Sequence, residues 1–288
     1  DAVATIGGAE AEPYLLKAIK LDTVPARITS ATALGGYGSP EAVDAVIVAL
    51  DDYRYEDVVL AAIKALGEAG DPKAVAPLAE KLKDRSYDVR EACVAALRQI
   101  GGEEALAAIA TRLGDVKEAI RDAAVSALVD SGKTSAPFAV EALRSENYLA
   151  RSNAVAVLNG IDAVPVGGGD LVWYRLAELT GEKKNEVDPA QAEVFAGIEG
   201  SIPALLEGVV HPASAVREYA FIALENVGEP AAEPTVAMVE DKAPATGKHW
   251  FAKRSGWSGA PSWRLDLWAA ATALNPRFKV NNAFIDLL

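Results

Sequence analysis

Apolar residues recur at helical spacing along this chain, in segments that repeat about every 31 residues. Each segment is centred on a leucine that follows small residues, and in most repeats a glycine stands four positions after it. The central leucines, called anchors below, are Leu34, Leu66, Leu97, Leu128, Leu158, Leu224 and Leu274. Small side chains four positions and one position before each anchor allow two helices to approach closely. The pattern predicts one amphipathic helix in each repeat.

A second helix is predicted in the remainder of each repeat. The glycines after the anchors suit a helix end in the left-handed conformation. Ser39-Pro40 and Asp71-Pro72 then supply a capping oxygen followed by a proline at the first helical position. The segments from Glu41, Lys73 and Glu104 are apolar on one side and charged on the other. Each repeat is therefore predicted to be a helical hairpin, and stacked hairpins share one core.

The repeats resemble a known family. The segment VREACVAALRQIGGEEALAAIATRL, from Val89 to Leu113, is similar to the short HEAT-like repeats of the bilin-lyase type. The tryptophan, tyrosine and Thr-Pro-Leu-His marks of tetratricopeptide and ankyrin repeats are missing. The resemblance covers residues 1–162 well and 199–240 moderately. It implies an all-α fold, an α-solenoid in the form of a right-handed superhelix of about seven HEAT-like hairpins.

Two segments interrupt the pattern. Residues 163–198 are predicted to be an insertion in the fifth repeat, because Leu158 and Leu224 are separated by about two repeat lengths. The repeats resume over residues 199–240. Residues 241–288 are predicted to form a Trp-rich basic loop followed by a C-terminal capping helix. Insertions in solenoids emerge on one face, which is often the binding face, although simple packing of this insertion is an equally open interpretation.

Aromatic and cationic residues gather in these two segments. Large rings beside guanidinium groups are typical of binding hot spots. The alternative is that the tryptophans cover the apolar end of the last hairpin as a cap. The candidate partner-binding residues are Trp250, Lys253, Arg254, Trp257, Trp263, Trp173 and Tyr174.

The formal net charge of −13 disfavours nucleic acid as a partner, because affinity for nucleic acid comes largely from Lys and Arg. Residues 1–240 hold 38 acidic and 21 basic residues, whereas 241–288 hold three acidic and seven basic. The second helices, expected on a concave face, would present acidic residues to a partner with a basic or extended segment. These are Asp44, Asp51, Asp52, Glu80, Glu103, Glu104 and Glu141. Docking of the basic tail onto a second copy is a further possibility.

An arginine stands seven positions before the anchor in five repeats. These arginines are Arg27, Arg90, Arg121, Arg151 and Arg217. Their regular spacing predicts a structural ladder that pairs with acids such as Asp57, Asp88 or Asp122 between adjacent hairpins. A track for phosphate or carboxylate groups is the sharper alternative.

No catalytic residue, metal or cofactor is predicted. Cys93 fills a slot that alanine takes in most repeats, where a buried thiol is inert. His211 and His249 are the two histidines and lack metal-ligand spacing. Nucleotide-binding and hydrolase motifs are also missing.

The sequence thus predicts a non-enzymatic scaffold or adaptor for protein–protein interaction. The alternative, implied by the family resemblance, is a bilin or tetrapyrrole lyase-like factor that handles a chromophore. Without an apolar run long enough to span a membrane, the protein is expected to be soluble. The compartment stays open: cytoplasmic, or periplasmic or exported if a leader was cleaved before Asp1.

Overall fold

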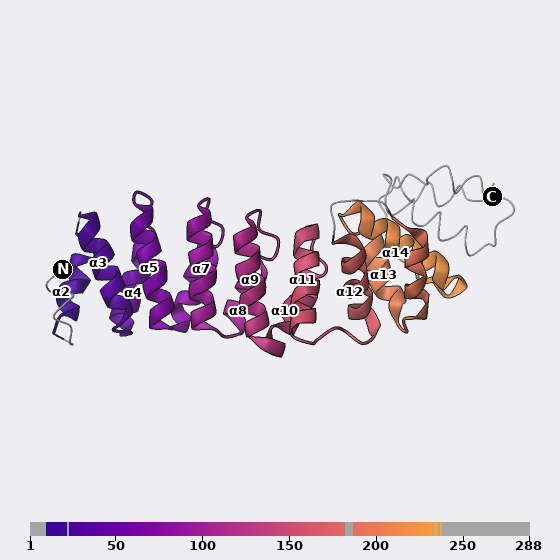
Figure 1. Cartoon of the computed structure of the whole chain (residues 1–288), viewed down its shortest axis with the longest axis horizontal. Coiled ribbons are helices and arrows are strands. Elements are labelled where there is room, and N and C mark those ends of the chain that lie inside the picture. The colour runs from indigo at the N-terminus through magenta and orange to yellow at the C-terminus, as the bar shows by residue number, and fades with distance from the viewer. Residues whose placement is uncertain (1–9, 22, 182–186, 232, 236, 238–288) are drawn as a thin grey trace. The chain divides into compact units, whose positions relative to one another are not determined.

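The computed structural model describes residues 10–237 except for 22, 182–186, 232 and 236, and these residues are helical with no strand among them (Figure 1). They fall into two compact units. The first comprises residues 10–142 and 156–163, and the second comprises 143–155 and 164–237. The predicted all-α solenoid of two-helix repeats is confirmed. The anchor at Leu274 and the predicted C-terminal cap lie outside the described residues.

Two layers of helices make up the first unit, preceded by α2 (Glu12–Ala18). The first helices of successive repeats pack side by side in one layer (Figure 1). They are α3 (Val24–Gly35), α5 (Glu56–Ala69), α7 (Tyr87–Ile100) and α9 (Glu118–Asp130). The second helices form the other layer: α4 (Pro40–Ala49), α6 (Val75–Lys81), α8 (Glu103–Ala110) and α10 (Ala136–Ala142). Short 3-10 turns, η1 (Pro72–Ala74) and η2 (Gly132–Ser135), lead into α6 and α10.

The second unit is built from less regular pieces. α11 (Tyr148–Gly160) is divided between the two units. α12 (Gly168–Thr180) packs against α13 (Ser201–Val209) and α14 (Ser214–Val227). η3 (Pro189–Gly197) packs on α14, and η4 (Glu229–Ala231) follows it. Tyr219 of α14 holds the η3 segment, because its hydroxyl accepts from the Asp188 amide at 3.1 Å and donates to Gln191 at 3.3 Å. The helix of the predicted insertion therefore contributes to the packing of this unit.

Local signals in the sequence set the ends of the helices. Ser39 caps α4 by accepting from the Ala42 amide at 3.1 Å, and Asp71 accepts from the Lys73 amide at 2.8 Å. Gly70 ends α5 with φ at +67°, in the left-handed region where a Cβ would be strained. All five glycines that follow the anchors have positive φ, as predicted.

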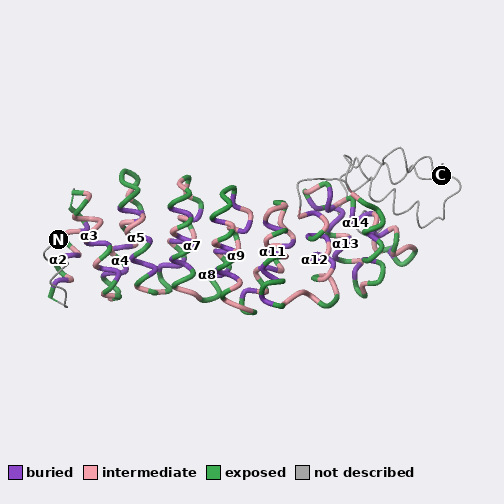
Figure 2. The backbone as a smooth tube through the Cα atoms, viewed as in Figure 1, coloured by how far each residue is buried: buried purple, intermediate pink, exposed green. Residues whose placement is uncertain are grey.

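Small residues bring the first helices of adjacent repeats into close contact. A Cβ built on Gly35 of α3 would lie 2.7 Å from both Cα and the carbonyl oxygen of Ala65 in α5. At the next interface, a Cβ on Gly67 of α5 would lie 2.9 Å from Cα of Ala96 in α7. Each of these helices carries buried residues along its length (Figure 2), among them Ala65 and Ala96 at the two close contacts. The spacing between hairpins is thus set by main-chain atoms that almost touch.

We predict that Gly35→Ala destabilises the first unit. The methyl group must push α3 away from the α5 main chain, and such overpacking costs about 1–3 kcal/mol. The better helix propensity of alanine offsets roughly 1 kcal/mol of this. Urea unfolding followed by circular dichroism measures the effect. The neighbouring Gly36→Ala is the matched control, since its Cβ would meet only the Ala33 carbonyl at 3.6 Å. Equal midpoints for the two variants would contradict the close approach.

Candidate functional site

The ladder arginines bind the turns that separate the repeats. In four of them, Nη1 donates to the carbonyls that stand five and six residues earlier, at the start of the same repeat. These are Arg90, Arg121, Arg151 and Arg217. The contacts six residues back are 2.8–2.9 Å long. The arginine thereby satisfies carbonyls that a turn would otherwise leave without donors.

The same side chains also reach the next turn. Nε and Nη2 of Arg90 donate to the two carboxylate oxygens of Asp115, at 2.9 and 2.8 Å. Arg27 forms an ion pair with Asp52. Arg151 meets no acid here and instead donates to the hydroxyl and the carbonyl of Thr180, at 2.9 and 2.8 Å. Arg90 and Arg151 therefore each clamp their own turn to the next repeat, whereas Arg121 and Arg217 hold their own turns.

The acids that the sequence suggested are not the ones in these clamps. Asp57, Asp88 and Asp122 lie exposed on the outer surface of the first helices. The guanidinium groups extend back past the helix start and into the turn, so they meet Asp52 and Asp115 instead. The predicted structural use of the ladder agrees with these contacts, but the predicted partners were wrong.

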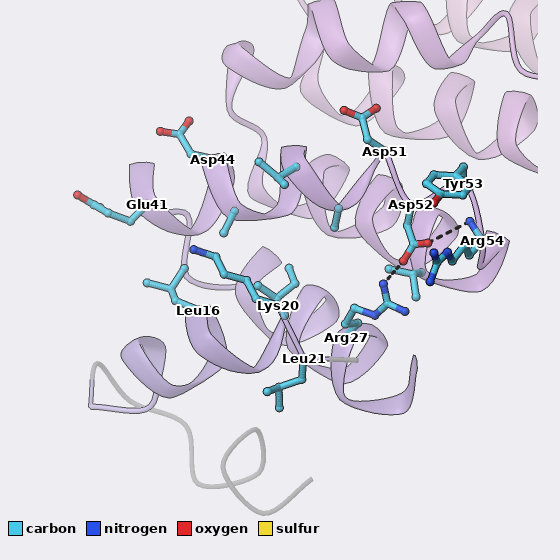
Figure 3. Close-up of a pocket in the computed structure, with 15 residues that line it drawn as sticks. Leu16, Lys20, Leu21, Arg27, Glu41, Asp44, Asp51, Asp52, Tyr53 and Arg54 are labelled. Carbon is cyan, nitrogen blue, oxygen red and sulfur yellow. Dashed lines mark hydrogen bonds and ion pairs between the residues drawn. The ribbon is translucent and has the colours of Figure 1, made fainter. Parts of the chain in front are cut away.

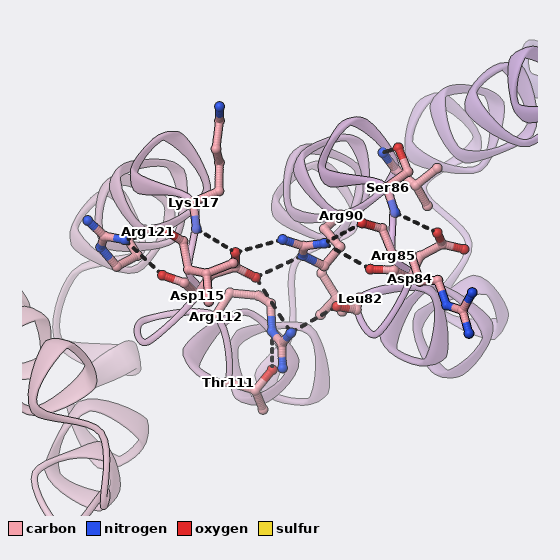
Figure 4. Close-up of polar contacts among 12 residues, drawn as sticks. Leu82, Asp84, Arg85, Ser86, Arg90, Thr111, Arg112, Asp115, Lys117 and Arg121 are labelled. Carbon is pink, nitrogen blue, oxygen red and sulfur yellow. Dashed lines mark hydrogen bonds and ion pairs between the residues drawn. The ribbon is translucent and has the colours of Figure 1, made fainter.

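Asp115 is the centre of a larger network in the first unit (Figure 4). It lies 3.7 Å from Nη1 of Arg112, and it accepts from the Lys117 amide at 3.0 Å. Arg112 in turn donates to the Leu82 carbonyl of the preceding repeat at 2.9 Å. Burial alone would raise the pKa of Asp115, but the hydrogen bonds from Arg90 and Lys117 outweigh it and hold the pKa below its usual range. Its side chain is 3% exposed and that of Arg90 is 8% exposed.

Cys93 lies in the core of α7 with none of its surface exposed. Burial raises the pKa of its thiol to about 12. A thiol that stays protonated and out of contact with solvent is a poor nucleophile. The packing thus gives Cys93 a structural place, equivalent to the alanine of the other repeats.

Trp173 and His211 form a polar cluster within the second unit. Their ring centroids are 5.7 Å apart, and the guanidinium carbon of Arg144 lies 5.5 Å from the Trp173 centroid. Trp173 Nε1 donates to Glu207 at 3.2 Å, and Arg144 contacts Asp170 at 3.1 Å. The cluster joins α12, α13 and the turns before α11 and α14.

His211 is held as one neutral tautomer in this cluster. Its Nε2 donates to the Arg144 carbonyl at 2.8 Å, and its Nδ1 accepts from the Ala213 amide at 3.1 Å. Burial lowers the pKa of the imidazole, and the hydrogen bond to the carbonyl offsets this only in part. A proton on Nδ1 would displace the Ala213 amide. In the sequence, a histidine next to a turn proline was the only sign of this role.

The candidate partner-binding residues have different places. Trp173 is 2% exposed and Tyr174 is 3% exposed, so both rings are taken up in packing within the second unit. Their burial follows from the position of α12 against α13 and α14. Trp250, Lys253, Arg254, Trp257 and Trp263 lie outside the described residues, as do His249 and the basic tail.

Exposed carboxylates line the second helices of the first unit. Several have lysine partners: Asp44 contacts Lys73 at 2.8 Å, and Asp51 contacts Lys81 at 3.5 Å. Glu80 contacts Lys83 at 3.0 Å. Glu103, Glu104 and Glu141 are exposed, and no ion pair joins them to another described residue.

A surface cleft of about 820 Å³ lies at the first repeats of this unit (Figure 3). One wall comes from α2 and the turn after it, with Leu16 and Leu21. The other comes from α4 and the turn after it, with Asp44, Val48 and Asp51. Leu21 is 53% exposed and Val48 is 71% exposed. Apolar surface, carboxylates and the cations Lys20, Arg27 and Arg54 are therefore combined in one concavity, which no pattern in the sequence indicated.

Two further observations concern metals and membranes. Across the described ranges, His, Cys, Asp and Glu side chains nowhere gather in a group of three that could hold a metal ion. None of the helices described has both the length and the apolar character needed to cross a bilayer.

Comparisons with known proteins agree with the repeat pattern. The family profile for HEAT repeats matches residues 51–129 and 75–159. No curated protein matches the chain in sequence. Among solved structures, the CpcE–CpcF complex of phycocyanin lyase from Nostoc sp. is 20% identical, with 93% of this chain and 96% of that chain covered, at a TM-score of 0.41.

Two other solved structures have comparable sequence identity and TM-scores. Human deoxyhypusine hydroxylase in complex with glycerol is 22% identical, with 78% of this chain and 87% of that chain covered, at a TM-score of 0.33. A designed armadillo repeat protein in complex with the peptide (KR)4 is 18% identical, with 74% and 98% covered, at a TM-score of 0.39.

We predict that His211 makes the second unit sensitive to acid. Because the folded pKa is depressed, the stabilisation is complete above the unfolded value of 6.5 and is lost as the pH falls through the folded pKa. The variant His211→Gln keeps a donor for the Arg144 carbonyl. The free energies of unfolding in urea of the chain and of this variant should differ by an amount that depends on pH only below pH 6.5. Glu218, whose pKa burial raises, and Asp115 are present in both proteins, so their contributions cancel in the difference. A His211 NMR titration at or above 6.5 would contradict the prediction.

Proposed function

We propose that this chain, whose residues 51–159 match the profile for HEAT repeats, is a non-enzymatic scaffold that binds a basic, extended segment of another protein. The described part of its first unit between residues 10 and 142 carries 21 acidic and 15 basic residues. A surface with this excess attracts and orients a basic partner.

The observation that carries the proposal is how the charged groups are distributed between interior and surface. Arg27 pairs with Asp52, Arg90 pairs with Asp115, and Arg121 donates to the carbonyls of its own turn. The carboxylates of Glu103 and Glu104, in contrast, stand exposed at the start of α8. These three arginines are thus used inside the unit, whereas the carboxylates of Glu103 and Glu104 are left for contact at the start of α8.

The acidic residues of the neighbouring second helices support the same interpretation. The ion pairs of Asp44 with Lys73 and of Glu80 with Lys83 are exposed on both sides. Exposed pairs of this kind contribute only about 0–1 kcal/mol each. A lysine or arginine of the partner can therefore replace Lys73 or Lys83 in these pairs at little cost in free energy. The proposed contact surface extends over α4, α6 and α8.

The interior offers little support for chemistry by this unit. Cys93 is protonated and buried, and the ladder arginines bind carbonyls or carboxylates of the chain itself. These contacts favour a scaffold over an enzyme. The Trp-rich segment with Trp257 and Arg254 remains a proposed second contact with the partner.

Binding of a labelled basic peptide tests the proposal. The fluorescence anisotropy of a fluorescein-labelled dodecapeptide of alternating Lys and Ser should rise when the full chain is added. The anisotropy of a labelled peptide of alternating Glu and Ser should stay unchanged. Affinity should fall as salt rises from about 0.05 to 0.5 M, because the contact is between exposed charges. Absence of binding at low salt would contradict the proposal.

Variants locate the contact. The double variant Glu103→Gln, Glu104→Gln should bind the Lys-Ser peptide with roughly threefold to tenfold lower affinity, since each exposed charge pair contributes little free energy. Glu56→Gln with Asp57→Asn is the matched control, because these acids occupy the same first turn of a helix, α5, in the other layer. An equal loss in both double variants would place the contact elsewhere.

The chromophore-handling alternative predicts a different outcome. A tetrapyrrole held by the chain would shift the absorption band of added bilin or haem in a micromolar titration. Such a shift, together with no binding of the basic peptide, would replace the scaffold proposal.

A further inference from the structure

One position of the arginine ladder in the first unit holds no arginine. Seven residues before the anchor Leu66 stands Val59, whereas the preceding and following repeats have Arg27 and Arg90 at this position. Val59 is 6% exposed and has no polar atom in its side chain. The groups that an arginine at this position would bind are therefore left without that donor.

Two main-chain carbonyls in the turn before α5 are the first of these groups. In the third repeat, Nη1 of Arg90 donates to the carbonyls five and six residues earlier. The equivalent carbonyls of the second repeat belong to Tyr53 and Arg54. Within the described ranges, no side chain and no main-chain amide donates to either of them. Both residues are exposed, so this turn is open to a donor from outside.

The carboxylate of Asp84, in the next turn, is the other group. It accepts from the Ser86 amide at 2.9 Å, as Asp115 accepts from the Lys117 amide at 3.0 Å (Figure 4). The two turns are thus built alike and hold their carboxylates in the same way. Asp115 receives two hydrogen bonds from Arg90, whereas no ion pair joins Asp84 to another residue that the structure describes.

Other polar groups of the two turns leave these acceptors available. Arg54 and Arg85 are exposed, and across the described part of the chain neither side chain donates to Asp84 or to the two carbonyls. Ser86 donates to Glu56 at 2.9 Å, and this exposed hydrogen bond joins the two turns without using the three acceptors. The set therefore has the acceptors of a clamp without its guanidinium.

The close packing of the first helices is compatible with a guanidinium between these turns. α3 and α5 approach each other at Gly35 as closely as α5 and α7 approach at Gly67. Between α3 and α5, Arg27 nevertheless forms its ion pair with Asp52. The small residues lie near the ends of α3 and α5, whereas the turns lie before the helices begin. A clamp and a close helix contact can therefore coexist at one interface.

We propose that the carbonyls of Tyr53 and Arg54 and the carboxylate of Asp84 form a receptor for one arginine side chain of the bound partner. One edge of the guanidinium donates to the carbonyls, and the other edge donates to the carboxylate. Arginine fits this set because its planar group presents five donors in a fixed fork, which lysine lacks. The proposal rests on the proposed function, since it names one side chain of the basic segment and the place where it binds.

Two peptides of equal charge test the side chain. Both are fluorescein-labelled dodecapeptides, one of alternating Arg and Ser and the other of alternating Lys and Ser. An acidic surface alone attracts both through their charge, whereas the receptor recognises the fork. With the full chain, the Arg-Ser peptide should bind at least about fivefold more tightly than the Lys-Ser peptide.

Three variants, each of which raises the net charge by one, test the place. Asp84→Asn keeps an acceptor for the Ser86 amide but removes the carboxylate, and Val59→Arg fills the receptor from within the chain. Both should reduce the preference for the Arg-Ser peptide to less than about twofold. Asp88→Asn is the matched control, because Asp88 is an exposed acid in the first turn of α7, and it should keep the preference.

The outcomes separate this inference from the proposed function. Equal affinity for the two peptides, a preference kept in Asp84→Asn, or a preference lost equally in Asp88→Asn would overturn the receptor and leave the scaffold in place. Failure of both peptides to bind at low salt would overturn both. A preference that is lost in Asp84→Asn and kept in Asp88→Asn is the result expected. If Val59→Arg loses its helical circular dichroism, the two asparagine variants decide alone.

Discussion

The paired hydrogen bonds between Arg90 and Asp115 are the contact on which the arrangement of the first unit most depends. One guanidinium satisfies two carbonyls of its own turn and the carboxylate of the next, so it fixes the position of one repeat against another. The pair is almost fully buried, and the loss of one partner from such a pair costs about 3–5 kcal/mol. Arg151 makes the same kind of bridge to Thr180 in the second unit without an acid.

The clamps and the close helix contacts together determine which residues remain exposed for contact with a partner. Gly35 against Ala65 sets the distance between first helices, and the arginines fix the turns at one end of those helices. The small residues, Cys93 and most of the regularly spaced arginines therefore make their contacts inside the unit. The second helices keep exposed carboxylates and, at Val48, exposed apolar surface. A repeat array of this composition is suited to contact with an extended partner.

The sequence predicted those features that depend on neighbours in the chain. Ser39 and Gly70 end helices through bonds to residues a few positions away, so the helix boundaries followed from local patterns. The regular spacing of the arginines was visible in the sequence, but their acidic partners were not. A long arginine side chain reaches a turn of the next repeat, and only the packing of the repeats places that turn. Trp173 could equally have been exposed or buried. The cleft could not be predicted, because the apolar run around Val48 hides which of its residues face the core.

A double-mutant cycle at the buried clamp tests this account most directly. Urea unfolding of the chain, Arg90→Met, Asp115→Leu and the double variant gives the coupling energy between the two side chains. The account predicts that each single change removes several kcal/mol, that the double variant loses little more than either, and that the coupling is about 2 kcal/mol or larger. Additive losses with a coupling near zero would contradict the claim that this pair joins the repeats.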